Sequence, residues 1–393
     1  MTPSARVQAA IEILDAIIAA AKSGGAPADR VFSDWFRTRR FAGSKDRRAV
    51  RELVYGAIRA CGPVPENGRA AMLRLGELDP VVMELFDGGP HAPAPVAKGE
   101  PVAKGGVAPD WLARRLASSG IDEVQAAALL DRAPLDVRVN ALKATRGELD
   151  LPEAGVPLMA PHGLRFAPGT PVESWPAYEQ GLIEVQDGGS QLTCEAVAAM
   201  PGETVVDLCA GAGGKTLALA AAMGGKGRLI ACDVDRARLQ RLAPRAQRAG
   251  AGWVETRLMN PNREAEALAD LTGQVDAVLI DAPCSGTGTW RRNPEARWRL
   301  TEKELARVIG IQGRLLDVAA CLVRPGGRII FVTCSLLDGE GADQLEAFLA
   351  RDSCWRSQPL ALGAGTPRGG GLRLDPARDG TDGFFVACLK SLC

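Results

Sequence analysis

Two cysteine-bearing segments contain the residues best suited to chemistry in this 393-residue chain. Asp281 and Cys284 lie in the run Asp-Ala-Pro-Cys-Ser-Gly-Thr-Gly, and Cys334 lies in Thr-Cys-Ser. Each segment follows a short apolar stretch typical of a strand, at 277–280 and at 329–332. A thiolate is a nucleophile, and a nearby carboxyl group can donate or accept a proton. These segments therefore predict a site of covalent catalysis, although free cysteines are also common as small buried hydrophobes.

A glycine-rich turn follows the strand expected at 204–208. Its residues are Cys209, Ala210, Gly211, Ala212, Gly213, Gly214 and Lys215. Glycines let a ligand approach the backbone and leave amide groups free at a helix start. Asp233 follows the next strand, where an acid can accept hydrogen bonds from ribose hydroxyls. Such turns also serve close packing, and an aspartate can cap the next helix, for which Asp235 is better placed. Turn and acid together favour an adenosine-containing ligand.

Two thiols, a carboxyl group and an adenosine site suit the methylation of carbon 5 of a pyrimidine. Carbon 5 becomes nucleophilic once a thiolate adds to carbon 6, and a carboxylic acid near ring nitrogen 3 stabilises that adduct. A second thiol or a base then assists loss of the carbon 5 proton. A thiol with an ordinary pKa of about 8.5 is only partly ionised at neutral pH, so we expect the site to lower the thiol pKa.

A parallel sheet would bring these segments together. Strand candidates at 204–208, 229–232, 277–280 and 329–332 alternate with helical segments at 215–223, 235–249, 302–322 and 340–351. This alternation predicts an α/β fold with a doubly wound, Rossmann-like sheet. Ligands of such sheets bind at the carboxyl ends of the strands, which is where the candidate residues lie.

The N-terminal region is helical and basic. Apolar residues recur at helical spacing over 5–22 and 46–58. Segment 31–60 has eight basic and three acidic residues, an excess of 8 − 3 = 5 charges; the basic residues are Arg37, Arg39, Arg40, Lys45, Arg47, Arg48, Arg51 and Arg59. A solvated helix face and a phosphate-contacting patch, with Trp35 and Phe36 nearby, both remain open. Residues 88–109 contain five prolines, five glycines and two copies of the sequence PVAKG. This composition predicts a flexible linker.

Composition excludes several classes of protein. With 46% hydrophobic and 24% charged residues the chain is globular, and 47 basic against 47 acidic residues leave no net charge. Ten cysteines without a CxxC pair, and two histidines, argue against a disulfide scaffold and against a metal site. The first 25 residues are too charged for a signal peptide and too short for a membrane span. We expect a cytoplasmic, thiol-reduced, metal-free monomer without a membrane partner.

Several motifs resemble the Nop/Sun family of RNA cytosine carbon-5 methyltransferases, which use S-adenosylmethionine. They are DLCAGAGGKT, DAPCSGTG, RRNPEARW, FVTCSLL and DGTDGFFVACL. GLIEVQDGGSQL (181–192) is similar to the segment that leads into the catalytic domain, and DVRVNALKATR (136–146) resembles the family's small RNA-contacting subdomain. FAGSKDRRAVRELVYGAIR (41–59) resembles the NusB-like domain of the bacterial RsmB/Sun branch.

The resemblance implies four parts of the chain. Residues 1–87 would form an all-α NusB-like RNA-binding domain and 88–109 a linker. Residues 110–180 would form a small α+β RNA-contacting subdomain, and 181–393 the Rossmann-like S-adenosylmethionine-dependent methyltransferase domain.

The resemblance also implies roles for individual residues. Cys334 would be the nucleophile and Cys284 would help release the product, whereas in DNA cytosine methyltransferases the Pro-Cys cysteine attacks. Asp281 would contact the cytosine edge, with Lys215 reaching towards it. The cofactor would be held by residues 209–215, Asp233, Asn260 and Asp281. The RNA would be held by Arg138, Asn140, Arg291, Arg292, Asn293 and Arg297. Ala212 replaces the family's usual proline, and Asn260 stands where a third cofactor acid is expected.

The leading hypothesis is thus an RNA 5-methylcytosine methyltransferase acting on small-subunit ribosomal RNA through a covalent cysteine adduct. A tRNA substrate is the runner-up within this class. A DNA methyltransferase would need Cys284 as its nucleophile. A non-catalytic, RNA-binding ribosome assembly factor is the alternative from a different class.

Overall fold

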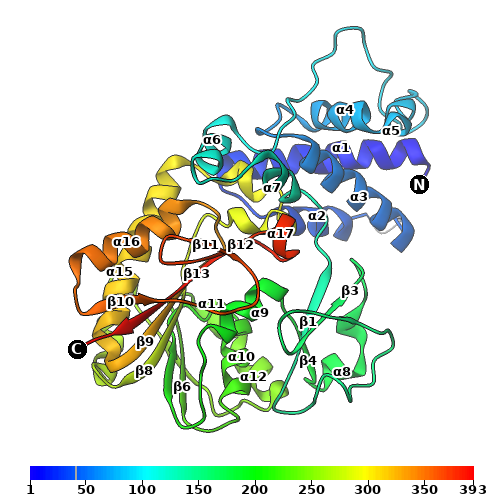
Figure 1. The fold of residues 1–393 in the computed structure, drawn as a ribbon. Helices are drawn as coiled ribbons and strands as arrows, with labels where there is room; N and C mark the ends of the chain where they lie inside the picture. Colours follow the sequence, from blue (N-terminus) through cyan, green and yellow to red (C-terminus); the bar gives the residue numbers. More distant parts are fainter. Residues whose placement is uncertain (40–41) are drawn as a thin grey trace. The chain divides into compact units, whose positions relative to one another are not determined.

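The structure is a computed structural model that describes residues 1–39 and 42–393. Arg40 of the basic segment and Phe41 lie outside the described residues. The chain divides into two compact units (Figure 1). The first unit comprises Met1–Asp131 and Thr289–Thr301, and the second comprises Arg132–Gly288 and Glu302–Cys393. The boundaries differ from those expected, because residues 110–131 and the segment 289–301 join the N-terminal helices.

The first unit is all-helical. Its helices are α1 (Pro3–Ser23), α2 (Ala28–Arg37), α3 (Ser44–Ala60), α4 (Gly68–Leu78), α5 (Pro80–Glu84), α6 (Asp110–Ser118), α7 (Glu123–Ala128) and α14 (Ala296–Arg299). The Thr2 side chain caps α1 by accepting a hydrogen bond from the Ala5 amide, and Gly24 ends this helix in the left-handed conformation. Val7, Leu14 and Ile58 are fully buried in a core that also takes in Trp298 of the inserted segment.

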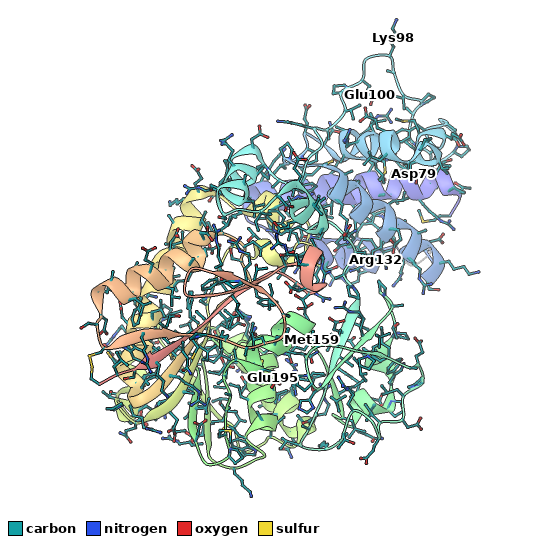
Figure 2. The ribbon with its side chains drawn as sticks, viewed as in Figure 1. Asp79, Lys98, Glu100, Arg132, Met159 and Glu195 are labelled. Carbon is teal, nitrogen blue, oxygen red and sulfur yellow. A yellow bond between two sulfur atoms is a disulfide. The ribbon has the colours of Figure 1, made fainter. Side chains whose placement is uncertain are left out.

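The proline- and glycine-rich segment 88–109 has neither helix nor strand, but its second half is anchored to the first unit. The Ala103 amide donates to the Ala70 carbonyl at 3.1 Å, and Arg69 forms an ion pair with Glu100. Figure 2 shows Lys98 at the tip of the loop. The segment joins α5 to α6 within one unit, so the expectation of a flexible linker between domains is wrong.

The second unit begins with a small antiparallel sheet of order β2-β3-β1-β4. Its strands are β1 (Leu135–Val139), β2 (Val156–Pro157), β3 (Gly163–Phe166) and β4 (Ile183–Val185), with α8 (Pro176–Glu179) beside them. Val137, Val139 and Phe166 pack with Trp175 in its core. The small subdomain thus extends past residue 180, to β4.

The larger sheet has the order β11-β12-β13-β9-β8-β5-β6-β7, with β10 paired to β13. Its strands are β5 (Thr204–Asp207), β6 (Arg228–Asp233), β7 (Glu255–Leu258), β8 (Val275–Asp281), β9 (Val323–Thr333), β10 (Trp355–Gln358), β11 (Thr366–Arg368), β12 (Gly371–Leu374) and β13 (Phe384–Ser391). Strands β5 to β9 pair in parallel, whereas β13 is antiparallel to β9. The carboxyl ends of β5, β6, β7, β8 and β9 therefore share one edge, as the sequence predicted.

Helices cover both faces of this sheet (Figure 1). Apart from α8, the α-helices of this unit are α9 (Gly188–Glu195), α10 (Gly214–Ala222), α11 (Arg236–Leu239), α12 (Leu242–Ala249), α13 (Glu264–Ala267), α15 (Glu302–Leu322), α16 (Ala342–Arg351) and α17 (Pro376–Asp379). Val205 packs with Leu217 and Leu242 on one face, while its neighbour Val206 belongs to the core that α15 and α16 cover. Successive strand residues thus face opposite layers, which confirms the doubly wound arrangement.

Cys354 and Cys393 are joined by a disulfide. They flank the antiparallel pair β10 and β13, in which Trp355 lies opposite Ser391. The expectation that all thiols are reduced is wrong for this pair, because strand pairing brings together two cysteines that are 39 residues apart in the sequence.

Candidate active site

The glycine-rich turn lies between β5 and α10 and requires glycine at two of its positions. Gly211 and Gly213 have φ angles of 56° and 87°, which favour glycine. A Cβ on Gly213 would lie 2.0 Å from Cδ1 of Leu242, so this glycine serves close packing. Gly214, the first residue of α10, has open space where its side chain would be, and the adjoining helix start offers amide donors. The turn therefore combines packing with a cradle for a ligand.

Asp233 ends β6 and is buried beside this turn. One carboxylate oxygen accepts the Gly211 amide at 2.7 Å, and the other accepts the Asp235 amide at 2.7 Å. Each oxygen keeps a second lone pair for a ligand hydroxyl. Asp235, not Asp233, caps α11. Asp233 thus shapes the turn and presents acceptor capacity at the strand end.

Asn260 lies two residues after β7, at the same edge of the sheet. The Met259 amide donates to the Asp233 carbonyl at 2.9 Å, which fixes this loop beside the end of β6. The Asn260 side chain is exposed. Asn260, at the position expected for a third cofactor acid, therefore lies in a loop attached beside Asp233. It offers a side-chain amide in place of a carboxylate.

Lys215 and Asp281 meet at the ends of α10 and β8. Lys215 Nζ lies 2.7 Å from Asp281 Oδ2, in a mostly buried ion pair. Burial lowers the pKa of Lys215, but the Asp281 carboxylate outweighs it, and the net pKa is above the usual value. The ammonium group also lies 5.5 Å from the centre of the Phe384 ring. Lys215 is therefore protonated and holds the carboxylate in place.

The two candidate thiols are in contact. Cys284 Sγ lies 3.3 Å from Cys334 Sγ, and both residues are partly exposed. Their loops follow the paired strands β8 and β9, and the Gly288 amide donates to the Cys334 carbonyl at 3.0 Å. Adjacent parallel strands thus place both sulfurs at one point of the rim, as their positions after the strands predicted.

The pKa of Cys284 is raised well above its usual value. The causes are the hydrogen bond with Cys334, burial, and the negative charges of Cys334 and Glu340. The expectation of a lowered pKa concerned the thiol that attacks carbon 6, whereas the resemblance gives Cys284 the role of releasing the product, so that expectation stays a prediction. At neutral pH this thiol keeps its proton and can donate it to the sulfur of Cys334.

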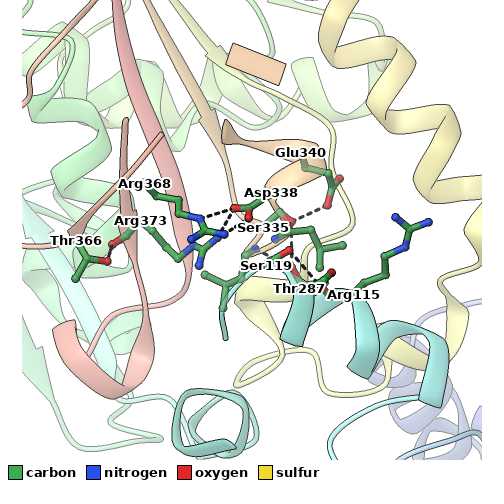
Figure 3. A network of polar contacts seen from close by, with 12 residues as sticks. Arg115, Ser119, Thr287, Ser335, Asp338, Glu340, Thr366, Arg368 and Arg373 are labelled. Atoms are coloured by element: carbon green, nitrogen blue, oxygen red, sulfur yellow. Dashed lines mark hydrogen bonds and ion pairs between the residues drawn. The ribbon is translucent and has the colours of Figure 1, made fainter. Parts of the chain in front are cut away.

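Two buried carboxyl groups in this region were missed by the sequence analysis. Glu340 accepts hydrogen bonds from Ser285, which follows Cys284. It also accepts one from Ser335, which follows Cys334 (Figure 3). Asp207 ends β5 and accepts the Thr216 hydroxyl at 2.6 Å. A Cys-Ser dipeptide occurs at both thiols, and this repeat was a signal that a common partner exists.

Several of the expected RNA contacts are buried instead. Arg138 donates to Gln186 at 2.7 Å, and the Asn140 amide group donates to the carbonyls of Gly181 and Ala249. Arg297 is fully buried, and burial lowers the pKa of its guanidinium group to about 10. It donates to the carbonyls of Ile58, Cys61 and Pro294. These three side chains are buried and form hydrogen bonds within the protein. The expectation that they contact RNA is therefore wrong.

The remaining candidates for RNA binding lie in the first unit. Arg291 is buried, whereas Arg292 is partly exposed and Asn293 is exposed. On α2 and α3, Arg37, Arg47, Arg48 and Arg51 are also exposed. The Arg39 guanidinium lies 4.0 Å from the centre of the Trp35 ring. The exposed cations are compatible with a solvated face and with a phosphate-contacting patch.

Known proteins resemble both the sequence and the fold. The family model described as 16S rRNA methyltransferase RsmB/F matches residues 195–390. The probable ribosomal RNA small subunit methyltransferase B of Synechocystis sp. is 35% identical over 299 residues, covering 72% of this chain and 66% of that protein. Ribosomal RNA small subunit methyltransferase B of Xanthomonas campestris is 35% identical over 291 residues, with the same coverage. The chain thus spans just under two thirds of the length of these relatives.

Solved structures extend the likeness to the whole fold. The crystal structure of PH0851 has a TM-score of 0.76 at 26% identity, and the match covers 100% of this chain and 99% of that chain. NSun6 from Pyrococcus horikoshii has a TM-score of 0.61 at 20% identity, covering 71% of this chain and 97% of that chain. Sheet order, glycine-rich turn and strand-end site together define an S-adenosylmethionine-dependent methyltransferase fold. Within that class, the chain belongs to the RsmB/Sun family of methyltransferases.

In residues 1–39 and 42–393, no group of three or more histidine, cysteine or acidic side chains could hold a metal ion. No helix within these ranges is both long enough and apolar enough to cross a bilayer.

Proposed function

We propose that this chain uses S-adenosylmethionine to methylate carbon 5 of cytosine in small-subunit ribosomal RNA. The observation that carries the proposal is the 3.3 Å contact between the sulfurs of Cys284 and Cys334, at the sheet edge that also bears the Lys215–Asp281 pair. The choice of ribosomal RNA is supported by the names of the curated relatives.

The residues of the turn suit the proposed cofactor. The open space at Gly214 and the amide groups at the start of α10 would accommodate and bind its polar groups. The free lone pairs of Asp233 would accept hydrogen bonds from ribose hydroxyls, and Asn260 would lie nearby. When bound, S-adenosylmethionine supplies an electrophilic methyl group.

Cys334 would attack carbon 6 of the cytosine, so that a sulfur–carbon bond forms and the double bond between carbons 5 and 6 is lost. Asp281, held by Lys215, would bind the edge of the ring that carries nitrogen 3 and the amino group. Carbon 5 then acts as the nucleophile towards the methyl group. Loss of its proton to Cys284 would re-form the double bond and expel Cys334.

The coupling between the thiols gives these steps an order. While Cys334 is free, its hydrogen bond with Cys284 and the negative charge of its thiolate form both raise the pKa of Cys284. Once Cys334 is bound to carbon 6, that charge is gone and the pKa of Cys284 falls. Cys284 would then release its own proton to solvent, and the resulting thiolate would accept the proton from carbon 5 once the adduct has formed.

The proposal is tested with labelled S-adenosylmethionine and transcripts of ribosomal RNA and tRNA. Wild type, Cys334→Ala and Cys284→Ala are compared for methyl transfer and for protein–RNA adducts on denaturing gels. We expect Cys334→Ala to be inactive without an adduct, whereas Cys284→Ala accumulates a covalent complex, because the second thiol is needed for release.

Each other outcome points to a different function. An adduct that depends on Cys284 as the nucleophile would reverse the roles of the thiols. Labelling of tRNA in preference to ribosomal RNA would change the substrate. Absence of methylation with every RNA, together with absence of cofactor binding, would favour a non-catalytic RNA-binding assembly factor.

A further inference from the structure

Glu340 lies in the short turn between β9 and α16 and is fully buried. The role proposed for the thiols does not use it. Its backbone carbonyl accepts the Thr333 hydroxyl at 3.2 Å, so the turn is attached to the end of β9 independently of the carboxylate. The side chain is thus a buried acid next to a reactive centre, and among the described residues no cation forms an ion pair with it, so its presence calls for an explanation.

The carboxylate connects the residues that follow the two thiols. One oxygen accepts the Ser285 amide at 2.7 Å, and the other accepts the hydroxyls of Ser285 and Ser335, the latter at 2.6 Å. Gln312 of α15 donates to Glu340 at 3.2 Å and to the Pro283 carbonyl at 2.9 Å. All these partners donate hydrogen bonds to the carboxylate. This matches an ionised carboxylate, which can only accept hydrogen bonds.

The hydroxyl of Ser335 is itself fixed from the other side. It accepts the Leu337 amide at 3.1 Å and lies 3.1 Å from the Thr287 hydroxyl, which accepts the Leu336 amide (Figure 3). The loops after β8 and β9 are therefore joined by a continuous network of hydrogen bonds. A shift of Glu340 would move both loops, and with them both sulfurs.

We infer that Glu340 is a positioning residue that holds Cys284 and Cys334 at reacting distance and supplies a fixed negative charge beside them. This inference rests on the proposed two-thiol function, since it assigns Glu340 a part in the same reaction. The negative charge of Glu340 is also one of the causes of the raised pKa of Cys284. Glu340 would thus help Cys284 to keep its proton before the adduct forms.

Glu340→Gln tests this inference with little change of shape. The Gln carbonyl can still accept the Ser285 amide, and the new amide group can donate to the two serine hydroxyls, so the fold can persist without the charge. Glu346→Gln is the matched control, because Glu346 is an exposed acid on the neighbouring helix α16. Ser335→Ala is a second test, which removes one donor and keeps the carboxylate.

The first readout needs neither RNA nor cofactor. Iodoacetamide modification of Cys284 is followed by mass spectrometry as a function of pH, with the exposed Cys321 as an internal reference. We expect the midpoint of the pH dependence of Cys284 alkylation to lie at lower pH in Glu340→Gln than in wild type and in Glu346→Gln. A residue that only stabilised the fold would change the melting temperature and leave this midpoint in place.

The second readout is turnover on the RNA that the wild type methylates. We expect Glu340→Gln and Ser335→Ala to lower kcat by about tenfold or more while KM for RNA stays within about twofold, as misplaced reacting groups do. The inference would be overturned if Glu340→Gln folds and matches the control Glu346→Gln both in the midpoint of Cys284 alkylation and in kcat. If Glu340→Gln does not fold, a Ser335→Ala variant with wild-type kcat would overturn it.

The two readouts separate the inference from the proposed function. If no RNA is methylated by the wild type, the proposed function fails, and the alkylation profile still decides whether Glu340 controls the thiol. An unshifted profile then overturns the inference, and a shifted profile supports it.

Discussion

Asp207, at the end of β5, shows how burial controls the proton on a single side chain near the site. One carboxyl oxygen accepts the Thr216 hydroxyl, and the other has no partner among the described residues. Burial raises the pKa of Asp207 to about 7; the Thr216 hydrogen bond opposes this and the charge of Asp281 adds to it. Near neutral pH the group is therefore partly protonated, next to the Lys215–Asp281 pair.

Asp207→Asn should flatten the dependence of stability on pH. The folded state keeps the Asp207 proton up to about pH 7, whereas the unfolded chain loses it around its ordinary pKa of 3.8. Wild type therefore loses stability as pH rises through this window, and the loss is complete above pH 7. The measurement is the free energy of unfolding in urea at pH 5 and pH 8. Equal pH dependence in both proteins would contradict the pKa assigned to Asp207.

At the scale of residues, the sequence was enough to predict that Cys284, Cys334, Lys215 and Asp281 lie at one edge of the sheet, while their roles stay predictions. Their types are reactive, and their positions after strands could be read from the chain. Glu340 was hidden, because an acid near a helix start ordinarily looks like a solvated residue. The repeated Cys-Ser dipeptide is visible in the sequence, but only the tertiary contacts show that both serines donate to Glu340.

At the scale of elements, the strands and helices that carry the site were predicted closely, because buried parallel strands leave continuous apolar runs. The helix expected at 235–249 is interrupted, and α11 ends at Leu239 before α12 begins at Leu242. Pro244 lacks the amide that would bond to the carbonyl of Gln240, so a new helix start suits it. The break could have been predicted from this proline.

Two neighbouring glycines of the turn should respond differently to alanine. Gly213→Ala places a methyl group against Leu242 at a φ of 87°, and we expect it to lower the free energy of unfolding by about 1–3 kcal/mol. Gly214→Ala meets only open space in the free protein, so we expect unchanged stability and weaker binding of S-adenosylmethionine. Urea unfolding and calorimetric titration separate the effects. Unchanged cofactor binding in Gly214→Ala would place the ligand elsewhere.

At the scale of the whole molecule, the segment 289–301 could not be placed from the sequence. It lies between the Cys284 loop and α15 in the chain, yet it completes the core of the helical first unit. Arg297 reaches carbonyls of Ile58 and Cys61, more than 230 residues earlier. The family resemblance implied an RNA contact for Arg297, and its charge was consistent with that role. The sequence alone cannot distinguish a buried arginine that binds backbone carbonyls from an exposed one.

Arg297→Ala should therefore destabilise the first unit and not act mainly on RNA binding. Loss of the guanidinium group leaves the carbonyls of Ile58, Cys61 and Pro294 without this donor, at an expected cost of about 3–5 kcal/mol. Hydrogen exchange of α3 amides, and the melting temperature, would show the loss. A variant with wild-type stability and weakened RNA binding would contradict this assignment.

Arg292→Ala should show the opposite behaviour, because its side chain is partly exposed. We expect a melting temperature close to that of wild type and a lower affinity for RNA. If Arg292 contacts a phosphate, the slope of log K against log salt concentration should become shallower by about 1. An unchanged slope would exclude the phosphate contact.

The inserted segment also sets an order of events during synthesis. A nascent chain that has emerged only as far as Asp131 lacks Trp298, which is buried in the first core, and Arg299, which donates to the carbonyls of Gly25 and Ala26. The helical unit can therefore reach its final packing only after residue 301 has left the ribosome. By then the segments that form β5 to β8 have already been synthesised. The helices of the first unit thus precede β5 to β8 in the chain, yet they can complete their packing only after those strands have been synthesised.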